Sequence, residues 1–179
     1  MSEGIELINF TGIDIKVTPI GLGVWQFSEG GFWSALPKKT MNAIVKTSLD
    51  EGVNWFDTAE AYGGGKSERN LSIALKAAGK KDGEIIIATK WNPALRRAKN
   101  ILETIDERLY YLDGFSIDLY QIHNPLSLSS IKNQMKSIAK LVEKGKIKFV
   151  GISNFTTNMM RKAHEELEKN NVPLVSNQV

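Results

Sequence analysis

Cysteine is absent from the 179-residue sequence, which excludes disulfide bonds and thiolate chemistry. Histidine occurs only twice, too few to offer a convincing zinc site in the absence of cysteine. No apolar run approaches the ~18 residues of a membrane-spanning helix. The N-terminus also lacks a charged start followed by an apolar stretch, so no signal peptide is expected. These absences favour a reducing compartment, and we expect a cytoplasmic protein.

The sequence also lacks a strong excess of either positive or negative charge. The sequence has 23 Lys and Arg against 20 Asp and Glu, a formal net charge of +3. Basic residues are densest at Lys80-Lys81 and Arg96-Arg97, a pattern typical of solvated helix ends. Nucleic-acid and membrane partners are therefore not expected. With 42% hydrophobic residues, we expect residues 1–179 to form a single domain with a sizeable core.

What the sequence does contain is a regular alternation of short β-branched runs and amphipathic stretches. Such repeated βα units predict a parallel sheet, either wound into a (β/α) barrel or doubly wound. The apolar–polar alternation on either side of Thr11-Gly12-Ile13-Asp14 predicts a β-hairpin within residues 1–18 that covers one end of the sheet. The predicted strands are 19–25, 54–57, 84–90, 116–123, 146–152 and 173–179, and the predicted helices are 41–49, 67–78, 101–112, 131–142 and 156–170.

The segment from Gln26 to Lys39 is predicted as a long loop that carries Phe27, Phe32 and Trp33. Loops of this length in a compact domain are often functional. Two interpretations carry equal weight: the aromatic rings line an apolar pocket, or they pack the loop onto the body of the protein.

Four complementary side chains stand at or just beyond the ends of three successive predicted strands: Asp57, Tyr62, Lys90 and His123. Because the carboxyl ends of parallel strands face one way, these groups are expected to converge. A nearby ammonium lowers the pKa of a phenol, a carboxylate holds a lysine in place, and a histidine orients a substrate oxygen. We therefore expect Tyr62, Lys90 and Asp57 to form a hydrogen-bonded cluster that His123 faces. Each residue alone is also typical of a turn or a solvated strand end.

The motifs around these residues resemble the aldo-keto reductase family. These motifs occur in order along nearly the whole chain, hairpin included. Any one motif alone is weak evidence for the family, but the combination is specific. By contrast, a doubly wound nucleotide-binding domain is disfavoured, because Gly63-Gly64-Gly65 lacks the G-x-G-x-x-G spacing. The matching stretches are Gly21-Leu-Gly23-Val24-Trp25, Asp57-Thr-Ala-Glu-Ala-Tyr62-Gly, Ser67-Glu68, Ala88-Thr-Lys90, Asp118-Leu-Tyr-Gln-Ile-His123, Gly151-Ile-Ser-Asn-Phe155 and Asn177-Gln178.

The resemblance implies a (β/α)8 TIM barrel whose first end the hairpin covers, and NADPH-dependent, reversible reduction of aldehydes or ketones to alcohols. It implies that Tyr62 is the general acid, that Lys90 and Asp57 tune it, and that His123 orients the carbonyl. Ser153, Asn154 and Gln178 match residues that hold the nicotinamide carboxamide. The resemblance further assigns Gly23, Val24, Trp25 and Asp57 to the cofactor site, and Trp25, Tyr62, His123 and Trp91 to the substrate site.

A barrel of this kind needs about 250 residues, so the chain accounts for roughly five and a half of eight βα units and stops within the sixth strand. Three explanations are open: a fragment of a longer chain, a barrel completed by another chain or by self-association, or a stable half-barrel. The cofactor preference, NADPH with NAD as the alternative, depends on phosphate-binding loops outside this segment. The alternative function is a catalytically inactive fragment, or a regulatory, cofactor-sensing subunit that needs a partner.

Overall fold

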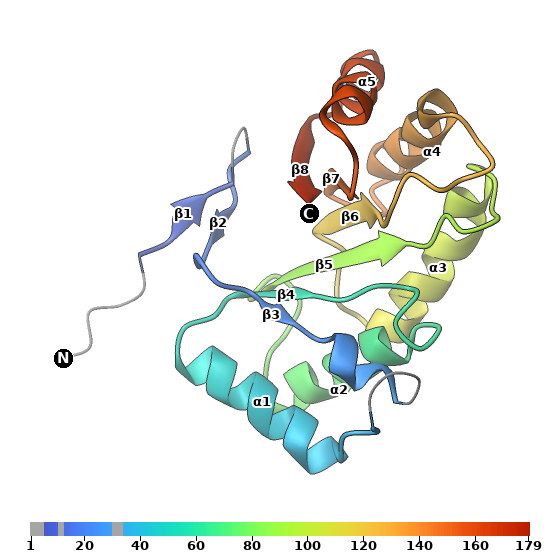
Figure 1. The fold of residues 1–179 in the computed structure, drawn as a ribbon. Helices are drawn as coiled ribbons and strands as arrows, with labels where there is room; N and C mark the ends of the chain where they lie inside the picture. The colour runs from blue at the N-terminus through green and yellow to red at the C-terminus, as the bar shows by residue number, and fades with distance from the viewer. Residues whose placement is uncertain (1–5, 11–12, 30–33) are drawn as a thin grey trace.

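The computed structural model describes residues 6–10, 13–29 and 34–179 of the chain. Its centre is a six-stranded sheet whose strands lie in sequence order, each parallel to the next (Figure 1). The strands are β3 (Leu22–Gly23), β4 (Trp55–Asp57), β5 (Ile86–Trp91), β6 (Leu119–Ile122), β7 (Phe149–Ser153) and β8 (Leu174–Gln178).

Five α-helices connect these strands, and each packs against the helix before it. They follow one another around the outside of the curved sheet (Figure 1). A sheet with sequential strand order and helices on one face is a segment of a (β/α)8 barrel, which excludes the doubly wound alternative. The helices are α1 (Lys38–Asp50), α2 (Lys66–Ala77), α3 (Asn100–Leu112), α4 (Ile131–Glu143) and α5 (Thr157–Glu168).

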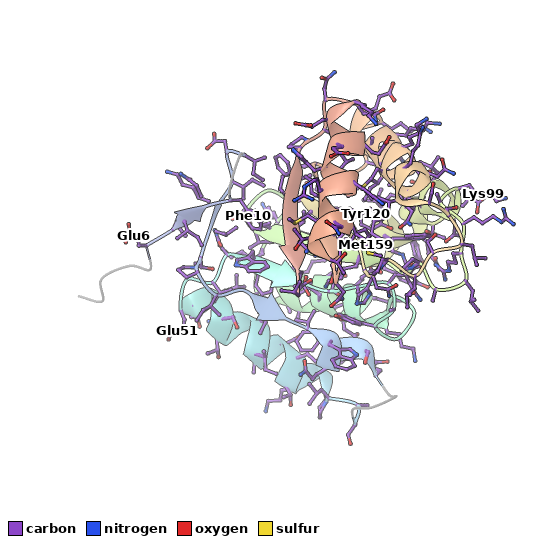
Figure 2. All side chains as sticks on the ribbon, turned by 45° about the horizontal axis from the view of Figure 1, so that its top comes forward. Glu6, Phe10, Glu51, Lys99, Tyr120 and Met159 are labelled. Atoms are coloured by element: carbon purple, nitrogen blue, oxygen red, sulfur yellow. The ribbon has the colours of Figure 1, made fainter. Side chains whose placement is uncertain are left out.

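Strand alternation separates two apolar layers. On β5, Ile87 belongs to the main core between sheet and helices, whereas Ala88 belongs to a smaller cluster on the inner face. Tyr120 of β6 likewise lies in the main core, well inside the molecule in Figure 2. The same alternation turns Lys90 toward the interior of the barrel.

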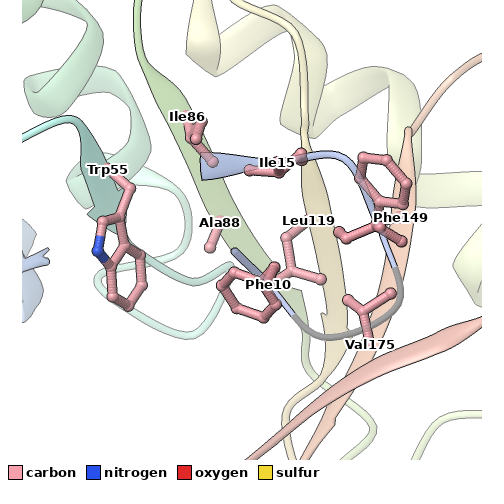
Figure 3. Close-up of a pocket in the computed structure, with 9 residues that line it drawn as sticks. Phe10, Ile15, Trp55, Ile86, Ala88, Leu119, Phe149 and Val175 are labelled. Atoms are coloured by element: carbon pink, nitrogen blue, oxygen red, sulfur yellow. The ribbon is translucent and has the colours of Figure 1, made fainter. Parts of the chain in front are cut away.

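The N-terminal hairpin covers the inner face where the strands begin. Its strands β1 (Ile8–Asn9) and β2 (Lys16–Val17) pair antiparallel. Phe10 and Ile13 pack against the inner cluster, and Figure 3 shows Phe10 directed at Ala88 and Leu119. The predicted cap is therefore confirmed, although Thr11 and Gly12 of its turn fall outside the described residues.

The segment after β3 differs from the predicted long loop. Trp25–Ser28 forms a 3-10 helix, and Phe27 is only 2% exposed. The Phe27 carbonyl accepts a hydrogen bond from Asn70 Nδ2 at 2.8 Å. Of the two interpretations of this segment, packing onto the body therefore holds for Phe27, which lies against α2. Phe32 and Trp33 lie outside the described residues.

The first barrel strand is shorter than the predicted 19–25. Pro19 has no N–H to donate to a ladder, and Gly21 lies so close to Trp55 that a β-carbon there would be 2.2 Å from the indole ring. Within the described part of the chain, β3 and β8 are the two edges of the sheet and each pairs on one side only. Among the same residues, no helix is long and apolar enough to cross a membrane.

Candidate active site

A buried ion pair lies where β4 and β5 end. Lys90 Nζ donates to Asp57 Oδ1 at 2.5 Å and to the Thr58 carbonyl at 2.9 Å. Lys90 is 1% exposed and Asp57 8% exposed. Burial lowers the pKa of Lys90, and the Asp57 carboxylate opposes that shift. The parallel register of β4 and β5, which sets Asp57 beside Ala88, brings the two groups together across 33 positions of sequence.

Tyr62 and His123 lie beside this pair. Lys90 Nζ is 5.3 Å from the centroid of the Tyr62 ring, within the range of a cation–π contact. The Tyr62 and His123 rings meet edge-on with centroids 5.5 Å apart, and Trp25 stacks on Tyr62 with centroids 5.8 Å apart. The structure thus brings together all four strand-end side chains, and Trp25 with them.

The expected hydrogen bond between Tyr62 and Lys90 is not formed among the described residues; the ammonium faces the aromatic ring instead. The pKa of Tyr62 is also not lowered but raised to about 12, first by burial and then by the Asp57 carboxylate. The reason is that Asp57 accepts the Lys90 ammonium directly and offsets the charge that was expected to favour the phenolate.

His123 is held through its backbone. Its N–H donates to the Trp91 carbonyl at 3.1 Å, and its carbonyl accepts from Asn154 Nδ2 at 3.2 Å. Burial and then the Lys90 charge lower the pKa of His123, against smaller opposing effects of Asp57 and Glu60. The imidazole is therefore neutral near pH 7 and retains one ring N–H to donate.

Residues 58–65, which connect β4 to α2, form the Tyr62 loop, and this loop turns sharply just after Tyr62. Gly63 has φ +69°, and a β-carbon there would lie 2.3 Å from the Ser28 carbonyl oxygen. Gly64 and Gly65 also have positive φ, and α2 begins at Lys66. The glycine run is thus explained by a tight turn packed against the 3-10 helix.

The three residues expected to hold a carboxamide also converge, at the ends of β7 and β8. Asn154 has left-handed backbone with φ +60°. Its side chain donates to Ser153 Oγ at 2.9 Å, and its backbone N–H donates to the Gln178 carbonyl at 2.8 Å. Since Asn154 Nδ2 also donates to the His123 carbonyl, these three residues are connected to the site formed by Asp57, Tyr62, Lys90 and His123.

Two of the residues expected to contact ligands, Val24 and Trp91, are completely buried. Val24 is completely buried; its N–H donates to the Asp57 carbonyl at 2.9 Å and its carbonyl accepts from Ser67 Oγ at 2.6 Å, so it has no free group for a cofactor. Trp91 is also completely buried, and its Nε1 donates to Asn100 Oδ1 at 3.1 Å. With Lys90 turned inward, alternation turns Trp91 toward the helices and away from the substrate site.

The other expected ligand positions remain accessible. A β-carbon at Gly23 would meet no atom within 4 Å, so space is open beside it. Trp25 is 44% exposed. Glu60 was not among the predicted site residues; it is 5% exposed and interacts with the segment after β5. The sequence feature that could have indicated Glu60 is its position as an acidic residue between Asp57 and Tyr62.

Comparison with known proteins gives a consistent result. The model of the Aldo/keto reductase family matches residues 19–179. The chain is 35% identical over 164 residues to aldo-keto reductase YhdN of Bacillus subtilis, a match that covers 87% of this chain and 49% of that protein. It is 32% identical over 157 residues to 6-dehydroglucose reductase of Novosphingobium aromaticivorans, covering 82% of this chain and 50% of that one.

The fold is shared with solved members of the family. A thermostable aldo-keto reductase, solved with the inhibitor epalrestat, superposes with a TM-score of 0.86 at 26% identity, over 97% of this chain and 62% of its own. The chain spans about half the length of the curated relatives it matches. Fold, family match and relatives agree, and the chain belongs to the aldo/keto reductase family.

Proposed function

We propose that the protein to which this chain contributes reduces aldehydes or ketones to alcohols with NADPH, reversibly, and that Tyr62 is the proton donor. The observation that carries the proposal is the buried Lys90–Asp57 pair beneath the Tyr62 ring, with His123 edge-on to the same ring. The activity is proposed for a completed barrel, because this chain spans about half of its curated relatives.

The side chains suit this chemistry. With a pKa of about 12, Tyr62 stays protonated at physiological pH and offers an O–H. Neutral His123 offers one ring N–H that can donate a hydrogen bond to the substrate carbonyl oxygen. As negative charge develops on the carbonyl oxygen, the nearby Lys90 ammonium stabilises it, and Tyr62 transfers its proton.

The chain also has groups that fit a nicotinamide cofactor, which supplies the hydride when bound. Ser153, Asn154 and Gln178 form a cluster of amides and a hydroxyl suited to a carboxamide. Asp57 Oδ2 is buried without a hydrogen bond from the described residues, so it remains an acceptor for a ligand hydroxyl. Gly23 leaves open space beside Asp57, its pairing neighbour on β4.

The second candidate is a non-catalytic, cofactor-sensing subunit that requires a partner. The observation that favours it is the open pair of sheet edges, β3 and β8, in the described residues. Such edges are normally covered, either by further βα units of the same chain or by another chain, and in the sensing role a partner would pair there. A complete set of four strand-end groups is not needed for this role, and for that reason we favour the reductase.

The deciding experiment measures NADPH binding and turnover in the same sample. NADPH is titrated while tryptophan fluorescence is followed, because Trp25 lies beside Tyr62. NADPH oxidation with a simple aldehyde is then measured for the wild type and Tyr62→Phe, in the chain alone and in a barrel completed with the missing units of a relative.

In the completed barrel, Tyr62→Phe should lower turnover ~10²–10⁴-fold while NADPH binding stays nearly unchanged, because it removes a proton donor. Near-wild-type turnover by Tyr62→Phe would refute the assignment. The 179-residue chain alone should bind NADPH weakly and show no turnover, because a few neutral hydrogen bonds of about 1 kcal/mol each do not offset the immobilisation of a dinucleotide. NADPH binding by the completed barrel without any turnover would favour the sensing subunit.

A further inference from the structure

We propose that Glu60 is a positioning residue: its carboxylate joins the Tyr62 loop to the loops that follow β5 and β6, and so fixes Tyr62 relative to Lys90 and His123. The catalytic meaning of this inference rests on the proposed function. The geometry itself can be tested without turnover.

Glu60 is bound on both carboxylate oxygens. Oε1 pairs with Arg96 Nη1 at 2.5 Å, and Oε2 accepts the backbone N–H of Asn92 at 2.8 Å. Its side chain is 7% exposed, whereas that of Arg96 is 35% exposed. The Glu60 backbone N–H donates to the Lys90 carbonyl at 3.0 Å. One residue therefore connects the loop that carries Tyr62 both to the residue that bears the ammonium and to the segment after it.

Arg96 extends the connection to a third loop. Its carbonyl accepts the Leu128 N–H at 2.9 Å and the Ser127 hydroxyl at 2.9 Å. Both residues belong to the loop after β6, which begins at His123. The path from Glu60 through Arg96 thus links the segments that carry Tyr62, Lys90 and His123.

Nothing else among the described side chains makes a hydrogen bond from the Tyr62 loop to residues 92–99 as Glu60 does. The other hydrogen bonds of this loop run to α2 and to β5. Thr58 Oγ1 donates to Ser67 Oγ at 2.9 Å, and the Thr58 carbonyl accepts from Lys90 Nζ at 2.9 Å. Without the Glu60 carboxylate, the loop would keep its hydrogen bonds to α2 and β5 and lose its side-chain hydrogen bonds to residues 92–99.

The carboxylate also acts on His123 electrostatically. It raises the pKa of His123, as Asp57 does, whereas burial and the Lys90 ammonium lower it. Loss of the Glu60 charge should therefore lower the pKa of His123 further. This shift provides a readout that a general loss of stability would not produce.

The test is an NMR comparison of the wild-type 179-residue chain with Glu60→Gln, which keeps the shape and removes the charge. The protein has two histidines, so the His123 signal has to be distinguished only from that of the exposed His164. In Glu60→Gln we expect loss of the cross-peaks between the Tyr62 and His123 rings, faster amide exchange at Asn92 and a lower His123 titration midpoint.

Glu68→Gln is the matched control. Glu68 is also a buried glutamate, paired with Arg108 at 3.1 Å, but it lies among the helices and is not one of the charges that shift the pKa of His123. It should leave the Tyr62–His123 cross-peaks and the His123 midpoint unchanged. The same losses in Glu68→Gln as in Glu60→Gln would show general loosening and overturn the proposal.

Arg96→Gln breaks the same pair from its more exposed end but keeps the Glu60 charge, so it decides the question by the Tyr62–His123 cross-peaks alone if Glu60→Gln does not fold. Wild-type Tyr62–His123 cross-peaks in a folded Glu60→Gln or Arg96→Gln variant would overturn the role of Glu60. Absence of aldehyde reduction in the completed barrel would refute the proposed function instead, and would leave these NMR results standing.

Discussion

At the scale of single residues, the proposed chemistry depends on the positive charge of Lys90, which is buried and is compensated by the Asp57 carboxylate. Lys90 is buried as an ammonium, and Asp57 and the Thr58 carbonyl are its hydrogen-bond acceptors. Removing one member of a buried pair leaves the other without compensation, which is more costly than removing both. The pair therefore serves the proposed catalysis, and its contribution to stability depends on both groups being present.

We predict that Asp57→Asn lowers the free energy of unfolding by about 3–5 kcal/mol, because the Lys90 ammonium stays buried without its carboxylate. The double variant Asp57→Asn/Lys90→Met should recover much of that loss, since no unpaired charge remains. Urea unfolding of the wild type, both single variants and the double variant measures the coupling. Strictly additive effects would contradict the interpretation of Lys90–Asp57 as a coupled pair.

At the scale of elements, α2 and α3 share a second buried pair behind the sheet. Glu68 Oε2 lies 3.1 Å from Arg108 Nη1, and Glu68 Oε1 accepts the Thr89 hydroxyl at 2.6 Å. Burial nevertheless dominates and raises the pKa of Glu68 to about 7, while Arg108 and Thr89 oppose it. The helix layer thus contains a carboxyl that changes charge near neutral pH.

The sign of the resulting pH dependence follows from proton linkage. Between its ordinary pKa near 4.5 and the raised value of about 7, Glu68 binds more protons in the folded chain than in the unfolded chain. Its contribution to stability is therefore greatest below about pH 4.5 and falls as pH rises to about 7, by roughly 3 kcal/mol.

We expect the free energy of unfolding of the wild type, taken relative to that of Glu68→Gln, to fall as pH rises from about 4.5 to about 7. Chemical denaturation at several pH values measures it. Glu103→Gln, which alters an exposed carboxylate of α3, is measured alongside as the control. A pH-independent difference for Glu68→Gln would mean that Glu68 does not titrate in this window.

At the scale of the whole molecule, the parallel sheet has two edges in the described residues, at β3 and β8. Unpaired strand edges present backbone groups that other chains can bind. Ile20, which lies just before β3, is 74% exposed and adds an apolar side chain at one edge.

We predict that the 179-residue chain self-associates, with an apparent mass that rises above 19.9 kDa as concentration increases. Ile20→Lys should weaken the association by placing a charge at the β3 edge. Leu126→Lys, at a leucine that is 72% exposed on the loop after β6, is the matched control and should not weaken it. Light scattering over a concentration series measures this, and a monodisperse monomer at all concentrations would disprove the prediction.

Much of the fold could be predicted from local patterns. The helix predicted at 67–78 is α2 (Lys66–Ala77), and the strand predicted at 84–90 is β5 (Ile86–Trp91). Apolar periodicity and glycine stops are local signals, so one sequence is enough to detect them. The convergence of Asp57, Lys90 and His123 could also be predicted, because it follows from the parallel order of the strands.

Other properties depend on the tertiary structure, because they arise from contacts between segments distant in sequence. Strand alternation turns Trp91 away from the site, and the Asp57–Lys90 contact leaves Tyr62 with a raised pKa. Glu60 binds a residue 36 positions away, which no local pattern indicates. The sequence by itself determined the elements, their parallel order and the family. Only packing decided which faces the side chains occupy and which charges are paired, because burial and pairing are properties of a side chain's surroundings in space.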